Sequence, residues 1–137
     1  AMLDGARTRA AQLGSNATLL QGDAHSLPFE DASFDTVVCT FGLCAIPDTD
    51  AAISQMHRVL RPEGRLIFVD HIESSSRAAR VVQRLLETLT VPLAGEHFLR
   101  RPLTKVRAAG FDVEQVQRFG FGLVERLVAR KPPLREP

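Results

Sequence analysis

The stretch from Gly22 to Asp48 constrains the fold most, because apolar segments in and beside it end in small or polar residues. The first segment, Ala17–Gln21, is followed by a glycine and an aspartate, and the second, Phe34–Thr40, leads to Gly42. Between them, residues 28–33 are rich in turn formers. Short apolar strands separated in this way are typical of a parallel sheet, whose strand carboxyl ends form the ligand-binding edge.

Helical and strand patterns alternate along the rest of the chain, which favours a doubly wound α/β domain. Arg65–Val69 is a nearly continuous apolar run, so we expect a central strand covered on both faces, ending at Asp70 and His71. Asp48 is expected to cap the preceding helix, and Gly14 to end the first one. The expected elements are a helix over 1–13, strands 17–21 and 34–40, a helix from 48 to about 60, strand 65–69, a helix from 74 onward with Val81 on its buried stripe, a helix over 103–109, and an antiparallel pair of strands, 111–119 and 123–130.

Composition limits the kinds of partner that the protein can have. The 137 residues suffice for one domain, and a net charge of +1 with neither Trp nor Tyr argues against nucleic-acid binding. No apolar run approaches the roughly 18 residues of a membrane span. Cys39 and Cys44 lack the spacing of metal ligands, so we expect no metal site and thiols kept reduced in the cytoplasm.

Three segments together resemble a known family. GDAHSLPFEDASFDTVV (22–38), RVLRPEGRLIFVDH (58–71) and a late AGF (109–111) follow one another as in class I S-adenosylmethionine-dependent methyltransferases. The nearest branch is the ubiquinone/menaquinone-biosynthesis type. The likeness extends from residue 1 to about 131, which we take as a partial methyltransferase domain, with 132–137 as a tail. It implies a Rossmann-like, mostly parallel sheet with a C-terminal antiparallel strand pair.

The chain departs from the family at its beginning. Members start with a strand, a glycine-rich loop that wraps the cofactor and a second strand ending in an acid, and none of these is found here. The family's sheet order is 3-2-1-4-5-7-6, so the absent strands 1 and 2 would lie between segments 17–21 and 34–40. Unpaired strand edges cost free energy. We therefore expect a truncated domain, or a homodimer in which strand exchange completes the sheet.

The resemblance implies that the cofactor is S-adenosylmethionine and indicates which residues bind its adenine. Asp23 would accept a hydrogen bond from the adenine amino group, and the Ala24 amide would face a ring nitrogen. Met2 would pack against the adenine ring. The alternatives from the residues alone are a turn carboxylate at Asp23 and a core position on a helix face for Met2.

The residues after the second strand would lie beneath the sulfonium group in similar enzymes. These are Thr40, Phe41 and Gly42, with a plain core aromatic as the alternative for Phe41. His71, at the end of the central strand, is the candidate catalytic base for the acceptor. A histidine hydrogen-bonded to a loop is the alternative there. We expect His25 in a loop near the adenine and His57 exposed on a helix.

The resulting functional hypothesis is methyl transfer from S-adenosylmethionine to a small organic acceptor. The alternative is a non-catalytic, methyltransferase-like module that associates with itself or with a partner. A nicotinamide-dependent oxidoreductase fits poorly, because its glycine fingerprint is missing.

Overall fold

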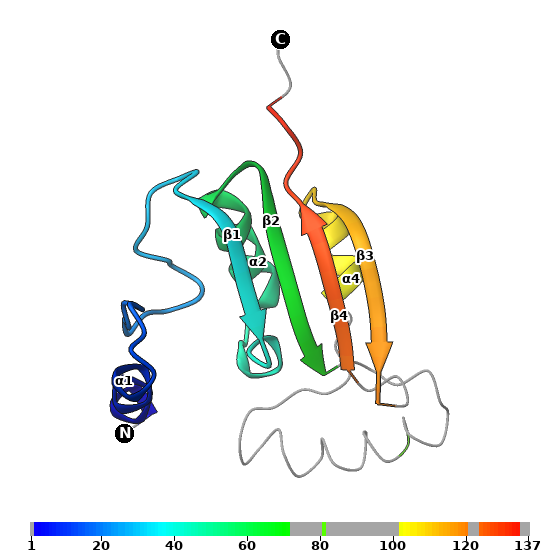
Figure 1. Cartoon of the computed structure of the whole chain (residues 1–137). Coiled ribbons are helices and arrows are strands. Elements are labelled where there is room, and N and C mark those ends of the chain that lie inside the picture. Colours follow the sequence, from blue (N-terminus) through cyan, green and yellow to red (C-terminus); the bar gives the residue numbers. More distant parts are fainter. Residues whose placement is uncertain (1, 72–80, 82–101, 121–123, 135–137) are drawn as a thin grey trace.

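The computed structural model describes residues 2–71, 81, 102–120 and 124–134, and Figure 1 shows their arrangement. The elements are, in chain order, α1 (Met2–Gln12), β1 (Phe34–Thr40), the 3-10 turn η1 (Leu43–Ala45), α2 (Thr49–Val59), β2 (Leu60–His71), α4 (Pro102–Ala108), β3 (Asp112–Phe119) and β4 (Val124–Arg130). Most of the expected elements are therefore confirmed within a residue or two of their predicted ends.

The four strands form one sheet in the order β1-β2-β4-β3. This order equals the last four positions, 4-5-7-6, of the order that the family resemblance implies. β1 and β2 are parallel, whereas β2–β4 and β3–β4 are antiparallel. The α/β class and the C-terminal antiparallel pair are confirmed, but in the described residues the sheet is mixed, with parallel pairing only between β1 and β2. Figure 1 shows α2 and α4 on the same face of this sheet.

The expected strand at Ala17–Gln21 is wrong: these residues have no regular secondary structure. The segment is exposed apart from Leu19, which is half-buried, and Leu20 is 57% exposed. A strand needs a neighbour to accept and donate its backbone hydrogen bonds, and the described residues provide none beside this segment. α1 precedes it, has no buried residue and lies apart from the sheet in Figure 1.

Local signals set the ends of both long helices. Gly14 has a φ of +60°, and the amides of Gly14 and Ser15 donate to carbonyls of α1 at 3.1 and 3.0 Å, which ends that helix. Asp48 caps α2, since its carboxylate accepts hydrogen bonds from the amides of Asp50 and Ala51. Both endings agree with the sequence expectation.

α2 passes into β2 with no loop between them. Leu60, expected to be helical, caps the carboxyl end of α2 and is also the first residue of β2. The turn at Glu63-Gly64 lies within β2, and Glu63 has a φ of +64°. A Cβ on Gly64 would lie 2.8 Å from the Arg61 carbonyl oxygen and 3.1 Å from that of Asp35. Only glycine fits this crossing of backbones.

The core lies between the sheet and the helices. Alternate residues of β2 (Leu66, Phe68 and Asp70) are buried, and so are Leu127 and Ala129 of β4. On the opposite face, Ile67 and Val69 are half-buried and Val38 is 60% exposed. The expected cover on both faces of the central strand is therefore not found among the described residues.

Two expectations concern the part of the chain after β2. Of the helix expected from residue 74 onward, only Val81 is described, and its side chain is 59% exposed rather than buried. The remainder of that segment lies outside the described residues. Among the helices that the structure does describe, none has the length and apolarity needed to cross a membrane.

Candidate functional site

Asp23 forms a tight turn that holds its own carboxylate. Its Oδ1 accepts a hydrogen bond from the His25 amide at 2.9 Å and lies 2.7 Å from His25 Nδ1. The Asp23 side chain is 66% exposed. The hydrogen bond from the His25 amide lowers the pKa of Asp23 below its ordinary value of 3.8; desolvation opposes this, and the nearby imidazole adds to the lowering. Asp23 is thus an accessible carboxylate that is already oriented through one of its two oxygens.

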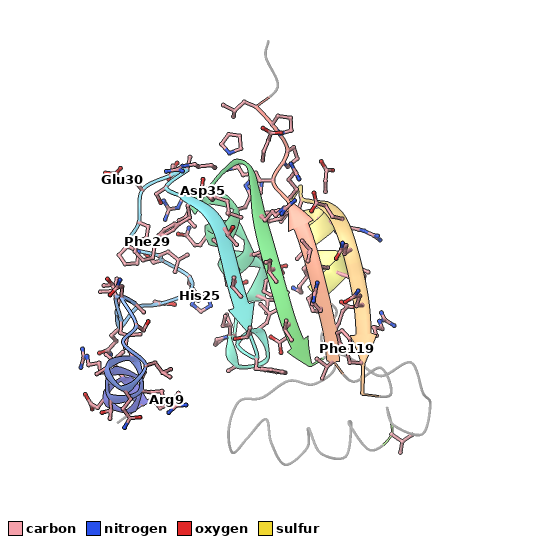
Figure 2. The ribbon with its side chains drawn as sticks, in the orientation of Figure 1. Arg9, His25, Phe29, Glu30, Asp35 and Phe119 are labelled. Carbon is pink, nitrogen blue, oxygen red and sulfur yellow. The ribbon has the colours of Figure 1, made fainter. Side chains whose placement is uncertain are left out.

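His25 connects this turn to the start of α2. Its Nε2 lies 3.3 Å from the backbone nitrogen of Asp48, which donates the hydrogen bond. Figure 2 shows His25 on the segment that joins α1 to β1. Because Nε2 accepts this bond, Nδ1 carries the proton that is directed to Asp23. The imidazole therefore bridges two segments that are separated by 23 positions in the sequence.

The carboxyl end of β1 is shaped by Phe41 and Gly42. The Phe41 amide donates to the Val69 carbonyl at 2.8 Å, so the ladder with β2 continues one residue past β1. Phe41 then adopts a φ of +49°, its side chain is 52% exposed, and the chain turns into η1. The first amide of η1, that of Leu43, donates to Asp70 Oδ2 at 2.7 Å. This contact fixes the loop against the end of β2.

An open groove of about 570 Å³ runs along β1. Its lining includes Ala24 from the Asp23 turn and Thr40 from the end of β1, so the structure places these two predicted residues on one concave surface. The other lining residues are mostly apolar: Leu27, Phe29, Phe34, Thr36, Val37, Val38, Cys39, Ile46, Met56 and Val59. Such a surface suits a ligand with a flat apolar ring and a polar edge.

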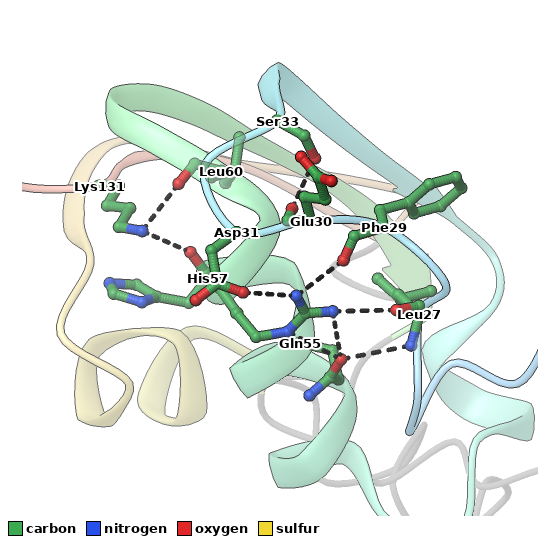
Figure 3. A network of polar contacts seen from close by, with 10 residues as sticks. Leu27, Phe29, Glu30, Asp31, Ser33, Gln55, His57, Leu60 and Lys131 are labelled. Atoms are coloured by element: carbon green, nitrogen blue, oxygen red, sulfur yellow. Dashed lines mark hydrogen bonds and ion pairs between the residues drawn. The ribbon is translucent and has the colours of Figure 1, made fainter.

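The segment that forms the far wall of the groove is held by Arg58 of α2. Its guanidinium donates to the carbonyl oxygens of Leu27 and Phe29 at 2.9 and 2.8 Å and to Asp31 Oδ1 at 2.6 Å. Gln55 Oε1 accepts from the same guanidinium and from the Leu27 amide. Figure 3 shows this network between α2 and the loop that carries Leu27, Phe29 and Asp31. The turn around Pro28 is therefore attached to α2 through its backbone.

Five of the seven predicted site residues do not line this groove. Asp23, Phe41 and Gly42 lie next to Ala24 and Thr40 in the sequence, whereas Met2 and His71 lie elsewhere. Met2 lies on α1 with 93% of its surface exposed, and α1 has no buried residue. The structure therefore does not place Met2 against the Asp23 turn. His71 is the last residue of β2 and pairs in register with Val124 of β4. This places His71 at the same end of the sheet as Phe41, whose amide donates to the carbonyl of Val69, two residues before His71.

Three residues act at the site across long stretches of sequence: His25, Asp70 and Arg58, over 23, 27 and up to 31 positions. From the sequence, His25 is expected near the adenine but is given no contact. Asp70 is expected only as a strand end, and Arg58 enters only as the first residue of segment 58–71. His57 is half-buried, with its ring 4.8 Å from that of Phe111, so the expectation that it is exposed is wrong. An arginine beside an apolar helical stripe is the one signal that could have pointed to a packed guanidinium.

Comparisons with known proteins agree with this architecture. A family model described as a methyltransferase domain matches residues 1–68. The chain is 34% identical over 99 residues to a demethylmenaquinone methyltransferase from Staphylococcus epidermidis, an alignment that covers 72% of this chain and 41% of that protein. It is 35% identical over 97 residues to the ubiquinone/menaquinone biosynthesis C-methyltransferase UbiE from Shewanella oneidensis, with 69% and 39% covered. The chain thus spans about two fifths of the length of these curated relatives.

The fold is also similar to that of solved methyltransferase structures. A crystal structure of an S-adenosylmethionine-dependent methyltransferase from Methanosarcina mazei superimposes with a TM-score of 0.70 at 20% identity, covering 96% of this chain and 77% of that one. At this identity the likeness is one of fold. From the family match, the relatives and the fold together, the chain belongs to the class I S-adenosylmethionine-dependent methyltransferases, in the branch that resembles UbiE.

Proposed function

We propose that this chain binds S-adenosylmethionine in the groove beside β1 and takes part in methyl transfer to a small organic acceptor. The observation that supports this most is the shared groove, in which the Asp23 turn and the end of β1 contribute Ala24 and Thr40 to one surface. Ligands of open α/β sheets bind at the carboxyl ends of the strands, and this groove extends to that end of β1.

The residues present fit an adenine ring. Within the described part of the chain, Asp23 Oδ2 accepts no hydrogen bond, while Oδ1 is held by His25. An oriented carboxylate with one open oxygen is a suitable acceptor for an exocyclic amino group. The Ala24 amide and the apolar groove wall would then face the ring itself. In this proposal Thr40, Phe41 and Gly42 bind the part of the ligand that lies over the end of β1.

Methyl transfer requires little of the protein beyond the positioning of the methyl donor and the acceptor. S-adenosylmethionine supplies a methyl group that its sulfonium already activates. The chain's residues would hold this group in line with the acceptor and exclude water from it. We propose His71, at the end of β2, as the base that takes the proton from the acceptor's nucleophilic atom. Met2 has no part in this binding proposal, because α1 lies away from the groove.

Titration calorimetry with S-adenosylmethionine and S-adenosylhomocysteine tests the binding. We expect binding that Asp23→Ala weakens at least about tenfold, the loss of one charge-assisted hydrogen bond. Asp35→Ala is the matched control, since Asp35 is an exposed carboxylate ion-paired to Arg61 at the other end of β1. Absence of heat at millimolar ligand, or equal affinities of the Asp23 and Asp35 variants, would contradict the proposal.

The second candidate function is self-association, which is favoured by the edge of β1, where no other described strand pairs. The two edge strands of the sheet differ in character. β3 carries Asp112, Glu114 and Arg118, charged residues of the kind that discourage pairing, whereas β1 has a single charge, Asp35, at its start. The groove lies along the edge of β1, and the backbone of β1 can pair there with a further strand.

The occupant that we propose for this edge is the Ala17–Gln21 segment of a second copy. This segment is rich in apolar residues, exposed apart from the half-buried Leu19, and forms no strand in the described structure. It follows α1, which makes no buried contact, so residues 2–21 form an arm that is available for exchange. A two-fold dimer would then add one strand to each sheet.

Light scattering on the purified chain tests this proposal. We expect a dimer mass, and a monomer when Leu19→Asp and Leu20→Asp place charges on the exchanged segment. Met2→Asp on α1 is the control, because Met2 is an exposed apolar residue that lies outside the exchanged segment. A monomer in the unmodified chain, or a dimer that survives the paired substitutions, would contradict strand exchange.

We also propose that the protein works in the cytoplasm. The side chain of Cys39 is half-buried and packs against the core. Half-buried cysteines of this kind are ordinary in proteins of a reducing compartment.

A further inference from the structure

His25 contacts two segments of the proposed site, the Asp23 turn and the stretch that follows β1. It contacts the carboxylate of Asp23 through Nδ1 at 2.7 Å and the amide of Asp48 through Nε2 at 3.3 Å. Asp48 caps α2 and lies three residues after the end of η1.

The two contacts require a single protonation state of the ring. A backbone amide can only donate, so Nε2 must be unprotonated to accept from Asp48. Nδ1 must then carry the proton that is shared with Asp23. An imidazolium ion, which has a proton on both nitrogens, would keep the contact with Asp23 and lose the one with Asp48. The bridge therefore exists only with neutral His25.

We infer that His25 is a positioning residue, which sets the Asp23 carboxylate relative to the end of β1 through two contacts that only a neutral ring can make together. This inference rests on the proposed function. His25 occupies Oδ1 of Asp23 and leaves Oδ2 for the ligand. The side chain is 31% exposed, so solvent protons reach it. The charged groups around it are the carboxylates of Asp23 and Asp48, with Lys105 close to the latter.

Two isosteric substitutions separate the two ends of the bridge. The amide nitrogen of His25→Asn takes the place of Nδ1 and keeps the contact with Asp23 alone. The amide of His25→Gln reaches the place of Nε2 and keeps the contact with Asp48 alone. If His25 only stabilised the Asp23 turn, the asparagine variant would bind like the unmodified chain. If it only supported the start of α2, the glutamine variant would do so.

The experiment measures the affinity of the full chain for S-adenosylhomocysteine at pH 8. We expect both variants, and His25→Ala, to bind about five- to tenfold more weakly than the unmodified chain. Unchanged affinity in either isosteric variant, or tighter binding in any variant, would overturn the inference.

A measurement without ligand keeps the inference separable from the proposed function. The ¹⁵N shifts of the His25 ring at pH 8 report which nitrogen carries the proton, and we expect Nδ1–H with an unprotonated Nε2. A proton on Nε2 would overturn the bridge even if the cofactor binds. If no chain binds the cofactor while the Nδ1–H tautomer is found, the proposed function fails and the bridge stands.

Discussion

The buried carboxylate of Asp70, at the end of β2, accepts a 2.7 Å hydrogen bond from the backbone amide of Leu43, 27 positions earlier in the sequence. Both residues are 1% exposed. The bond joins the carboxyl ends of the two parallel strands through the loop that follows β1. Since a buried amide without a partner is costly, Asp70 determines where that loop can lie.

We therefore predict that Asp70→Ala lowers the free energy of unfolding by about 2–3 kcal/mol, because the Leu43 amide is left buried and unpaired. Asp70→Asn retains an acceptor oxygen and should recover part of this loss. Urea denaturation followed by circular dichroism measures both. Asp35→Ala, which removes a carboxylate that is 81% exposed, is the control and should change stability by less than about 0.5 kcal/mol. Equal effects of the Asp70 and Asp35 substitutions to alanine would contradict the prediction.

Arg58 should stabilise the fold through the carbonyl oxygens that it binds rather than through its ion pair. Arg58→Ala leaves the Phe29 carbonyl without a donor among the described residues and the Leu27 carbonyl with the Phe29 amide alone, and we expect a loss of about 2 kcal/mol. Asp31→Ala breaks only the ion pair, whose carboxylate is 78% exposed, and should cost less than about 0.5 kcal/mol. Thermal or urea unfolding distinguishes the two. If Asp31→Ala proves as damaging as Arg58→Ala, the ion pair is the dominant interaction and our assignment is wrong.

A methyl group on Gly64 should be poorly tolerated. It would lie 2.8 Å from one backbone oxygen and 3.1 Å from another, and backbone cannot move away as a flexible side chain can. We expect Gly64→Ala to lower the free energy of unfolding by about 2 kcal/mol. At Gly22 an added Cβ meets nothing within 4 Å, so Gly22→Ala should stay within about 0.5 kcal/mol of the unmodified chain. Comparing the urea midpoints of the two variants tests this, and a tolerated Gly64→Ala would show that the crossing is looser than described.

His57 should make stability depend on pH. Burial first, and the Lys131 ammonium second, lower the pKa of His57 below its ordinary value of 6.5. The unfolded chain then binds more protons than the folded one between these two values, so stability is complete above about pH 6.5 and falls as the pH drops toward the lowered pKa. Urea midpoints from pH 7.5 to 5 measure the effect. His57→Gln cannot titrate and should have a flatter profile in this range; an unchanged slope would assign the dependence to other groups.

Local signals in the sequence were sufficient for most of the fold. The helical spacing of Ile53 and Met56, the cap at Asp48 and the apolar run of β2 depend on neighbours close in sequence, and each expectation agrees with the structure. Ala17–Gln21 has an equally apolar pattern but forms no strand, because a strand depends on a partner that sequence pattern alone does not provide.

The site was less predictable for the same reason. The rule that ligands bind at strand carboxyl ends anticipated that Ala24 and Thr40 would share a surface. The bridge from His25 to Asp48 is a contact between distant segments, and no local periodicity encodes it. The burial of His57 depends on Phe111, which lies far along the chain. Side chains that act across such distances become identifiable only when the backbone has placed them.

The direct passage from α2 into β2 has a mechanical consequence. No connector separates α2 from β2, and Lys131 donates to the carbonyl oxygens of His57 and Leu60 at their junction. The helix and the strand therefore form one rigid unit. Any widening of the groove for a ligand would then require residues 22–33 to shift against the Arg58 contacts, or residues 41–48 to shift against the Asp70 contact. Among the described residues, opening of the groove is therefore coupled to the breaking of hydrogen bonds rather than to the bending of a helix or strand.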